Sequence, residues 1–196
     1  MKPSYAAETL VRREDAVLLL VDMQERLAAT MERRASVLDN AVKLARTAAL
    51  IGVPMIVTRQ YPQGLGDTEP VLERALLALA EAGATVVGVD KTAFCCSVEL
   101  EFMEALGATA RTQVVIAGME THICITQTAL DLAARGFAVQ VAADACCSRD
   151  EASHETALQR LRSAGVVVTT TESVLYEAVG RAATDEFRAL LTIVKD

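Results

Sequence analysis

The chain has 196 residues, a net charge of −7 and 52% hydrophobic residues, which is enough for one domain with a core of ordinary size. The acidic balance argues against nucleic acid and anionic membranes as partners, because both are themselves negatively charged. No apolar run approaches the roughly 20 residues that span a bilayer, and the N-terminus lacks the apolar segment of a signal peptide. We therefore expect a single domain over residues 1–196, located in the cytoplasm.

Apolar runs and helical spacing of apolar residues alternate along the chain. The run 16–22 is apolar throughout, which predicts a strand buried on both faces, and similar runs predict strands at 53–58, 84–89, from 114, 137–142 and 166–170. Apolar residues at helical spacing predict helices at 37–51, 71–82, 98–106, 125–135 and 150–164, with short ones at 173–179 and 184–194. This alternation predicts an α/β fold, a three-layer α/β/α domain around a six-stranded parallel sheet.

Polar residues at the strand exits are the candidates for chemistry, because ligands bind at the carboxyl ends of parallel strands where the strand order reverses. Asp22, Lys91 and Cys124 each follow an apolar strand. If the order is 3-2-1-4-5-6, Asp22 and Cys124 face each other and Lys91 reaches in. A helix start and a nearby ammonium favour a thiolate at Cys124. Asp22 can take the proton of the Cys124 thiol and return it to a leaving group, so these residues could catalyse acyl transfer.

Each of these residues also has an ordinary structural explanation. A buried cysteine often serves as a small hydrophobe, an aspartate at a strand end often caps a turn, and a lysine after a strand is often solvated. Tyr61 and Phe94 either wall a substrate pocket or pack at the base of their loops.

The remaining cysteines and histidines are weaker candidates. Pocket wall or packing is the better interpretation of four cysteines, namely Cys95, Cys96, Cys146 and Cys147. The chain has five cysteines in all, and this odd number and the two adjacent pairs argue against a disulfide framework. The absence of a Cys-x-x-Cys pair argues against a zinc site. His122 lies two residues before Cys124, but we expect it to point away, and we expect His154 to be exposed on a helix flank.

No glycine-rich dinucleotide fingerprint or Walker sequence follows the first strand, so no cofactor is expected.

Three segments resemble the signature segments of the isochorismatase-like cysteine hydrolases: Val21-Asp22-Met23-Gln24, Lys91-Thr92-Ala93-Phe94 and Gly118-Met119-Glu120-Thr121-His122-Ile123-Cys124. Four further stretches, 60–66, 127–132, 144–149 and 170–175, resemble the isochorismatase domain-containing branch of that family. The resemblance runs in order from about Val17 to the C-terminus.

The resemblance implies the strand order 3-2-1-4-5-6 and a homo-oligomer, a dimer or larger. It implies that Asp22 is the base, Lys91 its electrostatic partner and Cys124 the nucleophile. It also implies a cis peptide bond at Met119-Glu120, with the backbone N–H groups of Glu120 and Cys124 forming the oxyanion hole. Substrate contacts are expected from Gln24, Tyr61, Phe94, Thr121 and Ile123.

Two departures from relatives narrow the expected activity. The loop 59–70 has no histidine, whereas nicotinamidases of this family bind a metal there, so no metal is expected. True isochorismatases lack the nucleophilic cysteine that this chain carries at Cys124. We therefore expect a cysteine hydrolase of amidase type that cleaves a small-molecule amide, imide or ester through a thioester. The alternative is a non-catalytic oligomeric scaffold or a thiol redox sensor that retains the fold.

Overall fold

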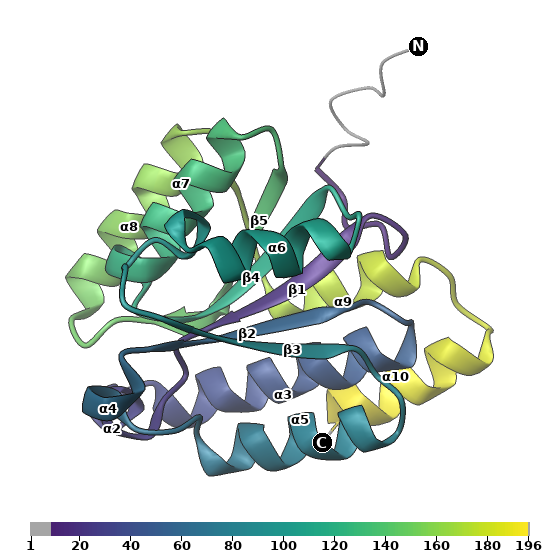
Figure 1. Cartoon of the computed structure of the whole chain (residues 1–196). Coiled ribbons are helices and arrows are strands. Elements are labelled where there is room, and N and C mark those ends of the chain that lie inside the picture. Colours follow the sequence, from purple (N-terminus) through teal and green to yellow (C-terminus); the bar gives the residue numbers. More distant parts are fainter. Residues whose placement is uncertain (1–8, 196) are drawn as a thin grey trace.

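Six parallel strands form the middle layer of the structure, a computed structural model that describes residues 9–195 (Figure 1). The strands are β1 (Ala16–Val21), β2 (Met55–Gln60), β3 (Val86–Lys91), β4 (Gln113–Met119), β5 (Ala138–Cys147) and β6 (Val167–Thr169). Their order is β3-β2-β1-β4-β5-β6, and all five pairings are parallel. The predicted sheet and its order are confirmed, and the order reverses between β1 and β4.

Helices cover both faces of the sheet (Figure 1). One face carries α3 (Arg34–Leu50), α5 (Pro70–Glu81), α9 (Thr171–Val179) and α10 (Asp185–Lys195), and the other carries α6 (Leu100–Ala108), α7 (Thr126–Ala134) and α8 (Glu151–Ser163). Four short turns of helix join these elements: α2 (Glu25–Ala28), α4 (Pro62–Leu65), η1 (Cys96–Val98) and η2 (Thr121–Ile125). Within residues 9–195, no helix combines the length and hydropathy needed to cross a membrane.

The central strand β1 shows why uninterrupted apolar runs specify this sheet. Leu18 and Leu20 belong to the core under α3, whereas Val17, Leu19 and Val21 belong to the core under α6, α7 and α8. Because successive side chains of a strand point to opposite faces, a strand covered on both sides must be apolar at every position.

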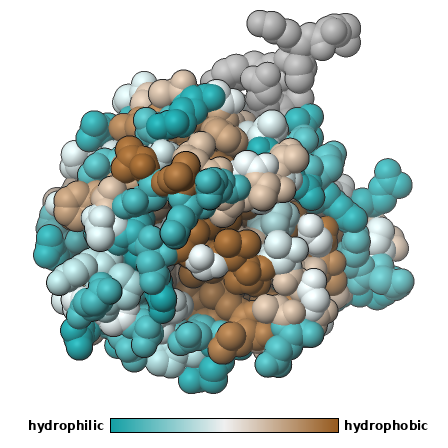
Figure 2. Space-filling view, in the orientation of Figure 1, coloured by the Kyte–Doolittle hydropathy of each residue, from teal (hydrophilic) through white to brown (hydrophobic). Residues whose placement is uncertain are grey.

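The edge of the sheet at β3 is less completely covered. Val87 of β3 is exposed, and so are Leu77 of α5 and Leu100 of α6 beside it. Figure 2 shows hydrophobic side chains gathered in the middle of this face. An apolar edge strand of this kind is a common surface for association with another chain.

Some element boundaries differ from the sequence-based prediction. β2 and β3 start and end two residues later than expected, so Lys91 closes β3 instead of following it. β5 continues to Cys147, five residues beyond the prediction, because Cys146 and Cys147 still pair with Gly118 and Met119 of β4 after a shift of register. The short helices α2 and α4 were not predicted.

Gly118 allows β4 to lie directly against the end of β1. It pairs with Val21, has φ of +141°, and a Cβ built on it would lie 2.1 Å from the carbonyl oxygen of Val21. Only glycine fits such a position without moving main-chain atoms. The glycine therefore sets the position of Val21, and with it that of the next residue, Asp22.

Gly118→Ala is expected to lower the free energy of unfolding by about 3 kcal/mol, because left-handed backbone strain and main-chain overlap act together. Urea denaturation of the variant and the parent measures this loss. The matched control is Gly107→Ala in α6, where an added Cβ meets open space and should be neutral or stabilising. Equal stability of the two variants would contradict the prediction.

Candidate active site

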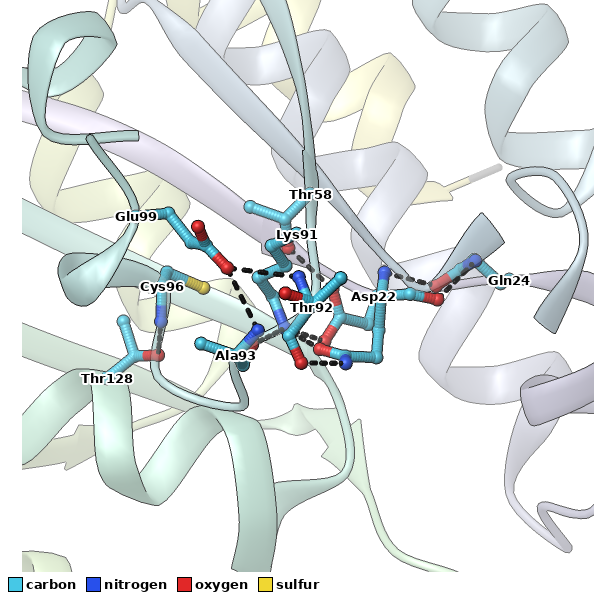
Figure 3. Close-up of polar contacts among 10 residues, drawn as sticks. Asp22, Gln24, Thr58, Lys91, Thr92, Ala93, Cys96, Glu99 and Thr128 are labelled. Atoms are coloured by element: carbon cyan, nitrogen blue, oxygen red, sulfur yellow. Dashed lines mark hydrogen bonds and ion pairs between the residues drawn. The ribbon is translucent and has the colours of Figure 1, made fainter. Parts of the chain in front are cut away.

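Asp22 stands at the point where strand order reverses, directly after β1. Its side chain is fully buried. Its Oδ1 accepts a hydrogen bond from Thr58 Oγ1 at 2.7 Å, and its Oδ2 accepts from Lys91 Nζ at 2.7 Å (Figure 3). The residue has φ of +52°, a left-handed conformation that aspartate tolerates better than most residues, and its N–H donates to the carbonyl of Thr58. The carboxylate is thus held by two neighbouring strands.

Lys91 is equally buried and fully engaged. Its Nζ donates to Asp22 Oδ2, to Gln60 Oε1 at 2.6 Å and to the carbonyl of Ala93 at 3.2 Å, which uses all three donors of an ammonium (Figure 3). Burial alone lowers the pKa of Lys91, but the carboxylate of Asp22 and the nearby thiols of Cys96 and Cys124 outweigh burial and raise that pKa overall. Lys91 and Asp22 therefore form a buried ion pair.

Lys91→Met is expected to lower the free energy of unfolding by about 3–5 kcal/mol, because it leaves the carboxylate of Asp22 buried without its counter-ion. Since the pKa of Lys91 is raised on folding, its contribution is complete below the ordinary value of ~10.4 and is lost as pH rises further. Urea denaturation from pH 7 to 11 should show a difference between parent and variant that shrinks above this value. Lys43→Met, which removes an ammonium bonded to one carbonyl, is the control. A difference independent of pH would contradict the expectation.

Cys124 lies in a π-helical turn, η2, between β4 and α7. It is 5% exposed. Burial raises the pKa of its thiol well above the usual range, the charge of Asp22 and a side-chain hydrogen bond to Asp22 raise that pKa further, and Lys91 only partly opposes them. Burial and the carboxylate of Asp22 thus oppose the stabilisation of a thiolate that was expected from the helix start and the nearby ammonium.

The turn that carries Cys124 is anchored to the segment after β5. The Met119–Glu120 peptide bond is cis. The carboxylate of Glu120 accepts a hydrogen bond from the backbone N–H of Arg149 at 3.0 Å. The guanidinium of Arg149 lies 3.5 Å from the same carboxylate, measured from Nε to Oε2. The ring of His122 pairs with Ser148 Oγ at 2.8 Å through Nδ1, so it points away from Cys124 as expected.

The side chain of Gln24 is bonded to the protein's own backbone. It is buried, its Oε1 accepts from the backbone N–H of Gln60, and its Nε2 donates to the carbonyls of Gln60 and Gly66. Because the whole amide is used in holding the segment after β2, this geometry does not support the predicted substrate contact of Gln24.

The other predicted substrate-contact residues fall into two groups. Tyr61 and Phe94 are both 54% exposed, in the segments that follow Gln60 and Lys91. Thr121 is buried and Ile123 half-buried, both in the turn that carries Cys124.

Cys96 lies near the ion pair of Lys91 and Asp22, in the loop that the sequence placed close to the site. It is buried, and burial raises its pKa to about 11. Its backbone N–H donates to Thr128 Oγ1 at 2.9 Å. Cys95 is half-exposed, with its sulfur 3.1 Å from Ser97 Oγ.

Cys146 and Cys147 are buried in β5, in the two cores, as the packing interpretation predicted. The prediction for His154 was wrong, since its side chain is 1% exposed.

One group within residues 9–195 has the composition of a metal site: Glu151, His154 and Glu155. Both ring nitrogens of His154, however, already have partners, Thr121 Oγ1 at Nδ1 and Arg33 Nη1 at Nε2. A histidine whose lone pair faces a guanidinium does not fit a cation, so this group is not a metal centre.

The sequence and the fold match known proteins. A model of the isochorismatase domain matches residues 16–173. Isochorismatase domain-containing protein 2A from Mus musculus is 34% identical over 184 residues, which are 93% of this chain and 84% of that protein. Isochorismatase domain-containing protein 1 from Danio rerio is 37% identical over 181 residues, 92% of this chain but only 61% of that protein.

Solved structures agree with the sequence matches. The MAR1 ribonuclease from Caenorhabditis elegans has a TM-score of 0.86 at 29% identity, with 95% of this chain and 93% of that chain covered. The YcaC product from Escherichia coli, described as an octameric hydrolase of unknown specificity, has a TM-score of 0.83 at 25% identity, with 98% and 92% covered. This chain therefore belongs to the isochorismatase-like hydrolase family.

Proposed function

We propose that this chain is a cysteine hydrolase that cleaves a small-molecule amide, imide or ester through a thioester on Cys124. The observation that carries the proposal is the buried ion pair of Asp22 and Lys91, which Thr58 also holds, with Cys124 near enough for the charge of Asp22 to act on its thiol. A neutral thiol beside an ionised carboxylate is a nucleophile with its base in place.

The reaction needs only these groups and water. Asp22 takes the thiol proton as the sulfur of Cys124 attacks the carbonyl carbon, and the backbone N–H groups of Glu120 and Cys124 stabilise the oxyanion. The protonated Asp22 then gives its proton to the leaving amine or alcohol as the carbon–nitrogen or carbon–oxygen bond breaks. Water, deprotonated by Asp22, attacks the thioester, and the departing sulfur recovers the proton as the acid leaves. Lys91 remains the ion-pair partner of Asp22 between these steps.

Burial of the nucleophile supports a small substrate. Only 5% of Cys124 is exposed, so a large substrate has little access to its sulfur. The relative from Caenorhabditis elegans is described as a ribonuclease. An RNA substrate is not favoured for this chain, because its net charge is −7.

We also infer a homo-oligomer. The relative from Escherichia coli is octameric, and the exposed apolar residues along β3 offer this chain a surface for self-association.

Trapping of the acyl-enzyme tests the proposed function. The protein is mixed with excess p-nitrophenyl acetate, quenched in acid and mapped by mass spectrometry. An acetyl group on Cys124 that disappears on incubation in water, and that does not form in Asp22→Asn, is expected. Acetyl groups on other residues alone would favour the alternative of a scaffold or redox sensor. Hydrolysis that continues after alkylation of Cys124 would exclude the thioester mechanism.

A further inference from the structure

A buried histidine links the turn that carries Cys124 to an arginine far away in the sequence. His154 comes from α8 and is 1% exposed. Its Nδ1 lies 2.8 Å from Thr121 Oγ1, and its Nε2 lies 3.2 Å from Nη1 of Arg33, the residue that precedes α3. The proposed reaction uses none of these three side chains directly.

The arginine fixes the protonation state of the ring. A guanidinium is always protonated and can only donate, so Nε2 of His154 must accept from Arg33. The ring proton of the neutral imidazole is therefore on Nδ1, from which it donates to Thr121 Oγ1. This is one specific tautomer, and an imidazolium at the same place would put an N–H against the N–H of Arg33.

Thr121 is well placed to transmit this contact. It directly follows Glu120 and lies three residues before Cys124, in the turn whose N–H groups are proposed to stabilise the oxyanion. Its carbonyl accepts from Thr126 Oγ1 at 2.6 Å, while its hydroxyl accepts from His154. Thr121 is thus held on its side chain by α8 and on its main chain by α7.

We propose that His154 is a positioning residue: the chain Arg33–His154–Thr121 holds the nucleophile turn in its active geometry only while His154 is neutral with its proton on Nδ1. Acid then releases the turn, because a protonated ring is repelled by Arg33. This inference rests on the proposed function for its consequence but not for its geometry.

The charged groups around His154 agree with this direction. Burial lowers the pKa of His154, and Arg33 lowers it further, while Glu151 and Glu155 of α8 oppose them. Because the pKa is lowered on folding, the neutral ring contributes its full stabilisation above the ordinary value of ~6.5 and loses it as pH falls below that value. The site is therefore sensitive to acid, not to alkali.

The tautomer can be observed without any substrate. The chain has two histidines, so in His122→Asn the remaining imidazole is that of His154. Nitrogen-15 NMR of this variant at pH 7 should show a neutral ring protonated at Nδ1. A ring protonated at Nε2, or an imidazolium at that pH, would overturn the proposal.

The positioning role is measured through Cys124 itself. 2,2′-Dipyridyl disulfide reacts with thiols even in acid, and its attachment to Cys124 is mapped by mass spectrometry. His154→Asn keeps an N–H donor for Thr121 but cannot be protonated. The labelling rate of the parent is divided by that of His154→Asn, so that the titration of the thiol, common to both proteins, cancels. This ratio should change by about tenfold as His154 is protonated, because the loss of one hydrogen bond has an effect of that size.

Two further variants are expected to change the pH dependence of labelling in ways that a simple loss of structure would not produce. Arg33→Leu removes the cation that disfavours protonation, so the acid step should move to higher pH. In His154→Leu, Cys124 should be labelled at every pH with the rate that the parent shows in acid, and no acid-dependent change should appear. A rate ratio that stays constant with pH, or an acid step unmoved in Arg33→Leu, would overturn the inference.

The outcome is separable from that of the proposed function. Labelling that follows His154 in a protein that forms no acyl-enzyme would leave the positioning role standing and remove the hydrolase. Acyl-enzyme formation with labelling independent of His154 would do the reverse.

Discussion

Cys124→Ala is expected to lower kcat/KM for any substrate of this protein by about 10⁴-fold or more, because removing the nucleophile of a covalent mechanism removes the reaction path itself. The fold should persist, since the side chain that is lost is small and Asp22 keeps its contacts with Lys91 and Thr58. Cys124→Ser should retain only a small part of the activity, because a hydroxyl is a weaker nucleophile than a thiol with the same base.

A panel of small amides, imides and activated esters, followed by release of acid or chromophore, gives the measurement. Cys146→Ala is the matched control, since it makes the same change at another fully buried thiol, in β5, with no contact to Asp22. The control should lose some stability but keep its turnover number. Hydrolysis by Cys124→Ala at the parent rate would exclude the thioester mechanism.

The arrangement of Asp22, Lys91 and Cys124 was predictable because it follows from topology. Apolar runs identify strands buried on both faces, and parallel strands end at one edge, so polar residues at the ends of β1, β3 and β4 must gather there. A two-residue error in β3 did not matter, since Lys91 lies at the end of the strand under either boundary.

Sequence patterns could not predict interactions between residues that lie far apart in the chain. Nothing in the local sequence of α8 indicates that His154 turns inward, because its partner Arg33 is 121 residues away. The length of β5 depended on a similar long-range pairing, of Cys146 and Cys147 with Gly118 and Met119 of β4. The direction of the Cys124 pKa was missed for a related reason: position at a helix start can be inferred from sequence, whereas burial beside Asp22 is a property of the assembled site.

Asp22→Asn should separate the two effects that a carboxylate can have on a thiol. Turnover is expected to fall by about 10⁴-fold, because no base remains to take the proton of Cys124 or to activate water. The thiolate should nevertheless form at lower pH than in the parent, since the charge of Asp22 raises the pKa of Cys124 and Lys91, no longer neutralised, lowers it.

Iodoacetamide labelling of Cys124 between pH 7 and 10 measures the second effect, and Asp144→Asn is the control, because it makes the same change at a carboxylate bonded to Thr171. Faster labelling combined with lost turnover would identify Asp22 as a general base that acts during the attack. Slower labelling of Asp22→Asn at every pH would instead mean that Asp22 maintains a thiolate in the resting enzyme. That result would contradict the proposed mechanism, in which Cys124 is a neutral thiol before the attack.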